Sequence, residues 1–250
     1  MNIFLTGANG YIGSSFLKKV SKTRNTIYAV TRKKNNKRIK NVKWLIGPIE
    51  KEWKELKKAD ILVHLAAEGG YDRFANFKNC YDFNVTRSTK LIINAFNSGC
   101  RKWLIISSKK EKKIKSLKFN SKSIKIFEKK PDYVYAFTKA LFSKICMEYS
   151  KKNNIKCRII RLYHVYGGNE KKTRLWPSLI KTAKQNKNFE MTTGNQKTDF
   201  NYIDDVVNGL TKALNFNYKR RAFPQSWDMG SGKNMSVRKF AEIIWKKLNP

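Results

Sequence analysis

Short apolar runs alternate along this chain with segments whose apolar residues recur at helical spacing. Residues 3–6 form the first run, residues 14–22 follow as a helical segment, and residues 26–31 form a second run. Apolar runs separated by helices are typical of parallel strands that a sheet buries on both faces. We therefore predict an α/β fold with a doubly wound parallel sheet.

The same alternation continues to about residue 165. Further strands are predicted at residues 42–46, 60–66, 103–107 and 157–162, and helices at residues 80–98 and 132–152. Beyond Gly167 the pattern becomes irregular until an amphipathic helix begins at the N-capping residue Ser236. We predict a sheet domain at residues 1–165 and a smaller, irregular lobe at residues 166–250, of which some segments return to the sheet.

One segment interrupts the alternation. Residues 109–130 contain ten lysines and show little apolar periodicity. Such a composition favours a long loop or a weakly ordered insertion.

Composition narrows the class of protein further. The 250 residues are 41% apolar, which is enough for a buried core and argues against a disordered chain. No apolar run reaches the roughly 18 residues that span a bilayer, and the N-terminus does not resemble a signal peptide. Four cysteines without C-x-x-C spacing and two histidines make a metal site unexpected. We expect a cytoplasmic protein.

The net charge of +36 would normally suggest a nucleic-acid partner. The lysines are spread along nearly the whole chain, however, and the arginines that read phosphates and bases do not cluster. We interpret the charge as a compositional bias and do not expect a nucleic-acid partner. The field would still attract an anionic small molecule.

A glycine-rich turn joins the first predicted strand to the first predicted helix, at residues 6–13. Glycine lets the backbone approach a pyrophosphate closely, and the helix N-terminus offers free N–H groups to its phosphates. The turn therefore predicts a Rossmann-type domain that binds a dinucleotide. The residues of the turn expected to contact it are Gly7, Asn9, Gly10, Tyr11, Ile12 and Gly13.

The end of the second predicted strand bears on the choice of dinucleotide. A carboxylate about 20 residues past the glycines would bind the ribose hydroxyls of NAD. Here the chain has Arg32 and no acid, and a guanidinium can pair with the 2′-phosphate of NADP. The sequence favours NADP over NAD and leaves NAD open.

A tyrosine and a lysine lie four residues apart on the helix predicted after the fifth strand, at Tyr135 and Lys139. This spacing puts both side chains on one helix face, where an ammonium group stabilises a phenolate and lowers the pKa of a phenol. The phenol can then exchange a proton with a carbonyl or carbinol oxygen. Ser108, at the carboxyl end of the fifth strand, can hydrogen-bond the same oxygen.

In this order, these motifs resemble the extended short-chain dehydrogenase/reductases, also called the NAD-dependent epimerase/dehydratase family. Between the glycine turn and Tyr135 lie His64-Leu65-Ala66-Ala67, Asn84-Val85 and Ser107-Ser108. Residues 161–167 resemble the family's Arg-x-x-Asn-x-Tyr-Gly segment, and residues 199–206 its Arg-Asp-Phe-x-Tyr-Val-Asp-Asp-Val segment. The resemblance covers essentially the whole chain, and residues 174–179 most resemble nucleotide-sugar 4-ketoreductases.

The resemblance implies a role for each matching residue. Tyr135 would be the acid/base, Lys139 its partner and a ligand of the cofactor ribose, and Ser108 the group that polarises the carbonyl. The further cofactor contacts that it implies are Leu65, Ala66, Ala67 and Asn84. The substrate contacts that it implies are Ser108, His164, Leu175 and Trp176. Lys197 is a further expected substrate contact, as the substitute for a basic residue that this chain lacks.

Several positions depart from the family's pattern. His164 stands where the family has Asn, and Thr198 stands where an arginine commonly grips the substrate diphosphate. Lys197 can replace that charge, without the bidentate fork. Gly47-Pro48 replaces an aspartate that contacts adenine, and the chain stops sooner than its relatives after the last predicted helix.

Lys109-Lys110 follow Ser108 where sugar dehydratases of the family have Asp-Glu, so a 4,6-dehydratase is not expected. We expect a reductase that uses NADPH to reduce a nucleotide-linked 4-keto-6-deoxy sugar. The alternatives are an epimerase with tightly bound NAD and a catalytically inert Rossmann protein that binds a partner. The resemblance also implies a homodimer formed through the helices at residues 80–98 and 132–152.

Overall fold

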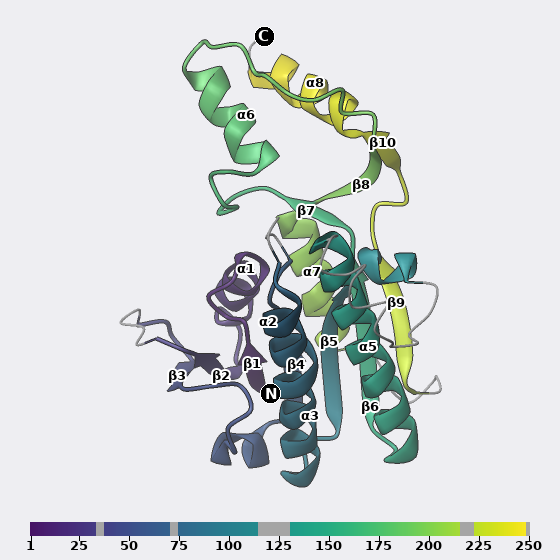
Figure 1. The fold of residues 1–250 in the computed structure, drawn as a ribbon. Coiled ribbons are helices and arrows are strands. Elements are labelled where there is room, and N and C mark those ends of the chain that lie inside the picture. Colours follow the sequence, from purple (N-terminus) through teal and green to yellow (C-terminus); the bar gives the residue numbers. More distant parts are fainter. Residues whose placement is uncertain (34–37, 71–74, 115–130, 216–222, 249–250) are drawn as a thin grey trace.

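The structure is a computed structural model that describes residues 1–33, 38–70, 75–114, 131–215 and 223–248. A seven-stranded sheet with helices on both faces forms the larger part, and a smaller lobe with a three-stranded sheet stands above it (Figure 1). Within the described residues, no helix is long and apolar enough to cross a membrane.

The large sheet has the strand order β3-β2-β1-β4-β5-β6-β9, and every neighbouring pair is parallel. The order reverses between β1 and β4, which is where open α/β sheets bind their ligands. The predicted fold class is confirmed. The strands are β1 (Asn2–Thr6), β2 (Thr26–Thr31), β3 (Val42–Ile46), β4 (Ile61–His64), β5 (Lys102–Ser108), β6 (Lys156–Leu162) and β9 (Gln225–Met229).

The two faces of the sheet bury two separate apolar clusters. Ile3 and Leu5 of β1 pack with helices α1 (Tyr11–Val20) and α7 (Ile203–Leu214), whereas Phe4, between them, packs on the opposite face. That face is covered by α3 (Ser88–Asn97) and α5 (Pro131–Lys152). Successive side chains of a strand point to opposite faces, so a strand buried on both sides must be apolar throughout.

The helix predicted at residues 80–98 is three consecutive pieces. α2 (Phe77–Tyr81) leads into a π-helical turn, η2 (Asp82–Arg87), and then into α3. A π turn widens the helix by one residue and is often found at functional sites. Here it carries Asn84, which is buried.

The first residues of the lysine-rich segment have regular structure. Residues 109–113 form a 3₁₀ turn, η3 (Lys109–Lys113), whose Glu111 is buried. The prediction of a loop or weakly ordered insertion at residues 109–130 is therefore wrong for residues 109–113. Glu111 has buried hydrogen-bond partners that hold this turn in place. Residues 115–130 lie outside the described part of the chain.

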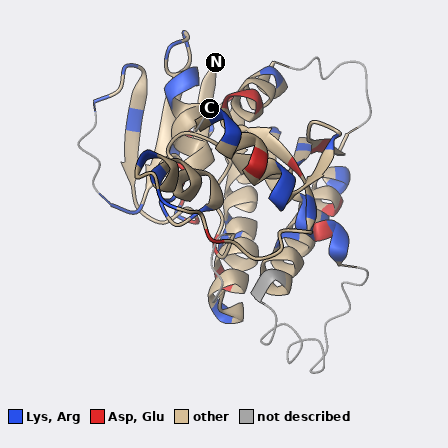
Figure 2. Ribbon diagram, turned by 90° about the horizontal axis from the view of Figure 1, so that it is seen from above, with Lys and Arg blue, Asp and Glu red and all other residues tan. Residues whose placement is uncertain are grey.

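The smaller lobe is built on strands β7 (His164–Tyr166), β8 (Lys197–Tyr202) and β10 (Asn234–Ser236), in the order β10-β8-β7. Helices α6 (Leu175–Lys184) and α8 (Val237–Leu248) pack against each other there. The boundary expected at residue 165 remains a prediction, and β9 and α7, which follow it, pack on the large sheet. Basic residues are spread over the elements of the fold (Figure 2).

Candidate functional site

The glycine turn lies against the end of β4. Gly7 has a φ of +77°, and a Cβ there would lie 2.6 Å from the backbone nitrogen of Ala66. A Cβ on Gly13 would collide with the carbonyl oxygen of Gly7. Only glycine permits both the left-handed backbone and this close approach. The turn therefore forms a shallow backbone cradle, and its neighbours Leu65 and Ala66 are the ones that the sequence assigned to the cofactor.

The cradle opens on a helix end that suits phosphate groups. α1 begins at Tyr11, and its N-cap Gly10 has no side chain that accepts from the first N–H groups. Those donors and the helix dipole favour an anion at this end. The first turn also contains no acidic residue that would repel a phosphate. These features fit the pyrophosphate of a dinucleotide.

Asn9 ties the cradle to the end of β2. Its Nδ2 donates to Oγ1 of Thr31 at 2.8 Å, and that hydroxyl donates to the carbonyl oxygen of Lys33 at 3.0 Å. Arg32 lies between the last two residues and is exposed. The structure therefore places Arg32 beside the glycine turn, with its guanidinium in solvent. Of the other predicted cofactor contacts, Ile12 is partly buried and Ala67 is exposed.

Lys110 lies between Ser108 and Tyr135. The backbone N–H of Lys110 donates to Oγ of Ser108 at 3.3 Å, and its ammonium lies 5.8 Å from the centroid of the Tyr135 ring. Ser108 is the last residue of β5, and Tyr135 lies in the first turns of α5. The carboxyl end of β5 and the start of α5 thus face each other.

Lys139 is buried one helical turn after Tyr135. Its Nζ donates to the carbonyl oxygen of Ile106 at 2.6 Å, two residues before Ser108 on β5. Burial lowers the pKa of this ammonium group to about 8. Only 2% of Lys139 is exposed, so bulk water screens its charge little. Lys139 therefore contacts β5 two residues before Ser108, and Tyr135 lies one helical turn before Lys139 on α5.

Asn84 supports this end of the sheet from the π turn. Its Oδ1 accepts from the backbone N–H of Glu68 at 2.8 Å, and its Nδ2 donates to the Glu68 carbonyl at 2.9 Å and to Oγ1 of Thr138 at 3.1 Å. A Cβ on Gly70 would touch the Tyr135 ring at 3.4 Å. Asn84 thus fixes the segment after β4 against α5, and its expected contact with the cofactor remains a prediction.

A buried carboxylate network, which no sequence motif indicates, lies behind Ser108. Glu111 Oε2 accepts from Oγ of Ser107 at 2.6 Å and from Oγ of Ser143 at 2.8 Å, while Arg161 forms an ion pair with Oε1. Arg161 also lies 3.5 Å from Asp228. The signal was weak, because a single Glu among lysines resembles a solvated turn.

Basic residues surround His164, the predicted substrate contact on β7. Burial first, and then the positive charges of Arg174, Lys109 and Lys110, lower the pKa of His164 to about 4. His164 is therefore neutral at pH 7 and packs edge-on against Phe200, with ring centroids 4.9 Å apart. These cations create a positive potential beside the carboxyl end of β5.

Lys109 reaches the position where the sequence lacks the family's arginine. Its Nζ hydrogen-bonds Oγ1 of Thr198 and lies 5.2 Å from the centroid of the Tyr163 ring. Burial lowers the pKa of Lys109, and the charge of Asp199 opposes that effect. The sequence assigned this charge to Lys197, which is exposed at the first position of β8.

Leu175 and Trp176 begin α6 in the smaller lobe. The Trp176 ring lies 5.1 Å from the ring of Tyr166, centroid to centroid. Both residues of α6 are partly buried. They therefore lie on a different element from Ser108, Tyr135 and Lys139, and their expected contact with substrate remains a prediction.

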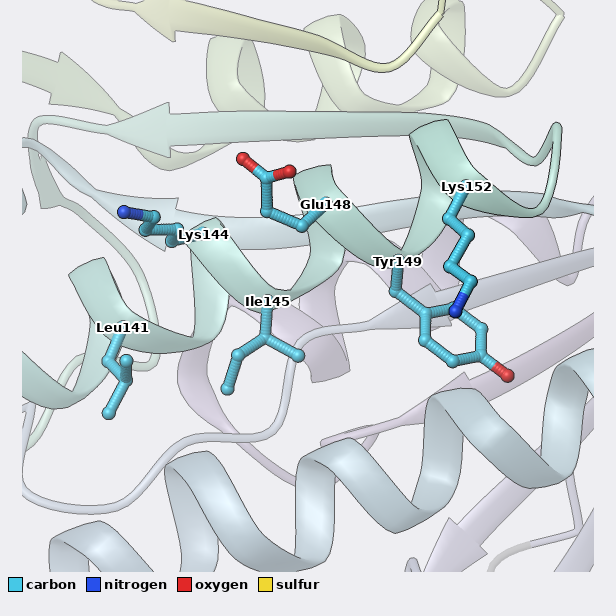
Figure 3. Close-up of a pocket in the computed structure, with 6 residues that line it drawn as sticks. All are labelled: Leu141, Lys144, Ile145, Glu148, Tyr149 and Lys152. Atoms are coloured by element: carbon cyan, nitrogen blue, oxygen red, sulfur yellow. The ribbon is translucent and has the colours of Figure 1, made fainter.

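A separate groove of about 550 Å³ runs along the outer side of α5. It is lined by Leu141, Lys144, Ile145, Glu148, Tyr149 and Lys152, and Figure 3 shows these side chains along successive turns of the helix. The groove lies in the half of α5 that follows Tyr135 and Lys139.

Comparison with known proteins agrees with this arrangement. The model of the NAD dependent epimerase/dehydratase family matches residues 3–224. The chain belongs to this family. It is 30% identical to CDP-abequose synthase of Salmonella muenchen, over 98% of this chain and 80% of that enzyme. The resemblance predicted from the sequence is confirmed, as is the expectation of an enzyme of this NAD-dependent class.

Two solved structures of epimerases share the fold. UDP-glucuronic acid 4-epimerase from Bacillus cereus, in complex with UDP-glucuronic acid and NAD, superposes with a TM-score of 0.78 at 23% identity, over 98% of this chain and 83% of that one. UDP-glucose 4-epimerase from Thermotoga maritima, with UDP-glucose, gives a TM-score of 0.77 at 17% identity, over 98% of this chain and 82% of that one.

Proposed function

We propose that the protein reduces a nucleotide-linked 4-keto-6-deoxy sugar, with NADPH as the source of hydride and Tyr135 as the proton donor. The proposal is supported by two sets of contacts at the carboxyl end of β5: Lys110 lies between Ser108 and the Tyr135 ring, and Lys139, one helical turn after Tyr135, hydrogen-bonds Ile106 of β5. The likeness to CDP-abequose synthase supports a reductase within the family.

The residues of the cofactor site support a dinucleotide. The backbone cradle of Gly7 and Gly13 and the open N-terminus of α1 would hold its pyrophosphate. Exposed Arg32, beside the Asn9–Thr31 hydrogen bond, would pair with a 2′-phosphate and so favour NADP over NAD. When bound, the reduced nicotinamide supplies a hydride to the keto carbon.

The protein's own groups supply the proton and orient the carbonyl. The hydroxyl of Ser108 would donate to the carbonyl oxygen, and the Tyr135 hydroxyl would transfer its proton to that oxygen as charge develops on it. Lys139, buried beneath them, favours the phenolate that Tyr135 becomes. Because His164 is neutral at pH 7, it can line the sugar site without adding a charge.

The cations of the site support an anionic substrate. Lys109 and Arg174 both act on His164, and Lys109 contacts Thr198. Ammonium and guanidinium groups at such an edge bind a diphosphate by charge and by hydrogen bonds. We assign the diphosphate of the nucleotide sugar to this side of the site, with Trp176 and Leu175 of α6 as neighbours of the nucleotide.

The test is a spectrophotometric assay of NADPH oxidation with a panel of nucleotide-linked 4-keto-6-deoxyhexoses. We expect turnover with at least one member of the panel and a loss of at least about 100-fold in kcat for Tyr135→Phe. Tyr133→Phe, two residues earlier on α5, is the matched control and should keep full activity.

Three results would overturn the proposal. Full activity in Tyr135→Phe would remove the proton donor. Release of NAD from the denatured protein, together with interconversion of two nucleotide sugars without added cofactor, would assign an epimerase instead. Absence of both activities would leave a binding protein.

We also propose a homodimer through the helices at residues 80–98 and 132–152. The partly apolar groove on α5, which includes Ile145 and Tyr149, supports a packing surface there. Light scattering after size exclusion tests the mass. Ile145→Glu should give a monomer if this surface is the interface, and an unchanged dimer would place the interface elsewhere.

A further inference from the structure

Lys110 lies near both Ser108 and Tyr135, which supply hydrogen-bonding groups to the proposed proton transfer. Its backbone N–H donates to Oγ of Ser108 at 3.3 Å, and its ammonium lies 5.8 Å from the centroid of the Tyr135 ring. A cation at this distance interacts with the ring and, more strongly, with a negative charge on its oxygen. In the proposed proton transfer, Lys139 is so far the one cation that stabilises the phenolate of Tyr135.

The turn that carries Lys110 is held in place. The next residue, Glu111, is buried and accepts hydrogen bonds from Ser107 and Ser143, at 2.6 Å and 2.8 Å. It also pairs with Arg161 of β6. A side chain that starts from a braced turn loses less freedom when it stays over the ring. The position of Lys110 is therefore part of the fold.

Among the described residues, the elements around the Tyr135 ring supply few carboxylates that would oppose the charge of Lys110. Lys139 of α5 is a second cation, and the pKa of its ammonium is lowered to about 8 by burial. The segment after β4 brings Glu68, whose backbone is held by Asn84, and Gly70, which lies against the ring. On η3, the carboxylate of Glu111 is already paired with Arg161.

Two further described residues lie near Tyr135 or Lys110. A Cβ on Gly69 would touch both Sγ of Cys80 and the Tyr135 ring, which places the α2 thiol on that side. His164 of β7 has a pKa of about 4, lowered first by burial and also by the charge of Lys110. Lys110 of η3 and Lys139 of α5 therefore both place positive charge on this side of the sheet.

We propose that Lys110 is a positioning residue that stabilises the phenolate of Tyr135 and so sets the pH range of proton transfer. This inference rests on the proposed role of Tyr135. In the reduction, the carbonyl carbon gains a hydride from NADPH, its oxygen gains the Tyr135 proton, and NADP⁺ and a phenolate remain. Solvent then returns a proton to the phenolate. Lys110 stabilises the charge that exists between these two steps.

The first test does not depend on activity. Tyrosine labelled with ¹³C at Cζ is incorporated into the full chain, the Tyr135 signal is assigned by its loss in Tyr135→Phe, and its chemical shift is followed against pH. We expect the titration midpoint of Tyr135 to rise by about one pH unit in Lys110→Met. Lys110→Arg keeps the positive charge and should restore the original midpoint.

The matched control is Lys113→Met, on the same turn, because Lys113 is exposed. It should leave the midpoint unchanged. An unchanged midpoint in Lys110→Met, or an equal rise in Lys113→Met, would overturn the proposal. Lys110→Gln serves as a second variant and should give the same rise as Lys110→Met.

The second test uses the reaction. A reductase loses activity as pH rises and Tyr135 loses its proton, so Lys110→Met should move that limb of the kcat profile to higher pH by about one unit. A merely structural role would lower kcat at every pH without moving the limb. If no keto sugar is reduced, the proposed function fails, whereas the NMR titration still decides the role of Lys110.

Discussion

Glu111 accepts a hydrogen bond from Ser107 at 2.6 Å, so a buried carboxylate joins the lysine-rich turn to the last residues of β5. Ser143 of α5 and Arg161 of β6 bind the same carboxylate. One side chain therefore holds three elements together behind Ser108.

Removing this carboxylate should destabilise the protein. Glu111→Ala leaves the two serine hydroxyls without their acceptor and Arg161 without its buried partner, and we expect a loss of about 3 kcal/mol in the free energy of unfolding. Urea denaturation measures it. Glu242→Ala, which breaks the exposed pair with Arg238, is the control and should cost less than about 0.5 kcal/mol. Equal losses in both variants would contradict the prediction.

His64 should make the protein sensitive to acid. Its Nδ1 lies 2.7 Å from Oγ1 of Thr6 and its Nε2 3.1 Å from Oγ of Ser88, and burial, followed by the charge of Lys139, lowers its pKa to about 3. The unfolded chain binds a proton near pH 6.5 and the folded chain does not. Stability is therefore lost as pH falls below 6.5, by about 2 kcal/mol at pH 5.

His64→Gln keeps one donor and one acceptor but has no group that titrates in this range. Its free energy of unfolding should change less between pH 7 and pH 5 than that of the unchanged protein. His164 also has a lowered pKa, of about 4, so His164→Gln should reduce the loss in the same way, and the double variant should show the smallest loss. An equal loss of stability in His64→Gln and in the unchanged protein would show that His64 is not the cause.

Gly13→Ala should impair dinucleotide binding. The added methyl group would collide with the carbonyl oxygen of Gly7, so the turn must shift, at a cost of about 1–3 kcal/mol. We expect at least a tenfold rise in the Kd of NADPH, followed by fluorescence of the reduced nicotinamide. Gly168→Ala, where a Cβ would meet open space, should bind NADPH normally. Normal binding by Gly13→Ala would rule out the cradle as the phosphate site.

Arg32→Ala should reduce the preference for NADPH over NADH. An exposed arginine that contacts a 2′-phosphate contributes a charge-assisted hydrogen bond, worth about 1.5–3 kcal/mol. The Kd of NADPH should therefore rise by about tenfold or more, whereas the Kd of NADH should stay nearly constant. Arg24→Ala, at an exposed position before β2, provides the control. Parallel changes for both cofactors would mean that Arg32 does not read the phosphate.

The sequence predicted the large sheet well because strands buried on both faces leave unbroken apolar runs. The strands at residues 26–31 and 42–46 were placed to the residue. β4 ends at His64, two residues earlier than predicted, because Leu65 and Ala66 turn to pass over Gly7. The strand β9 was not predicted, since its residues 225–229 are mostly polar and lie at the edge of the sheet.

The site was only partly visible in the sequence. Tyr135, Lys139 and Ser108 have a recognisable spacing and order, and the structure brings them to one end of β5. Glu111 gave only a weak local signal, and Lys110 stood out only as a departure from the Asp-Glu of sugar dehydratases, because the roles of both depend on partners distant in the chain. Arg161, for example, is 50 residues beyond Glu111. Tertiary contacts of this kind have no pattern that a short stretch of sequence can carry.

Strand β9 belongs to the large sheet but follows β7 and β8 of the smaller lobe along the chain, so the sheet and the lobe depend on each other. The chain passes between them at three links, from β6 to β7, from β8 to α7 and from β9 to β10. A fragment cut after residue 165 would leave β6 with an open edge and the α1 side of the sheet without α7. We therefore expect the two parts to unfold as a single cooperative unit. Neither part is expected to fold when it is expressed alone.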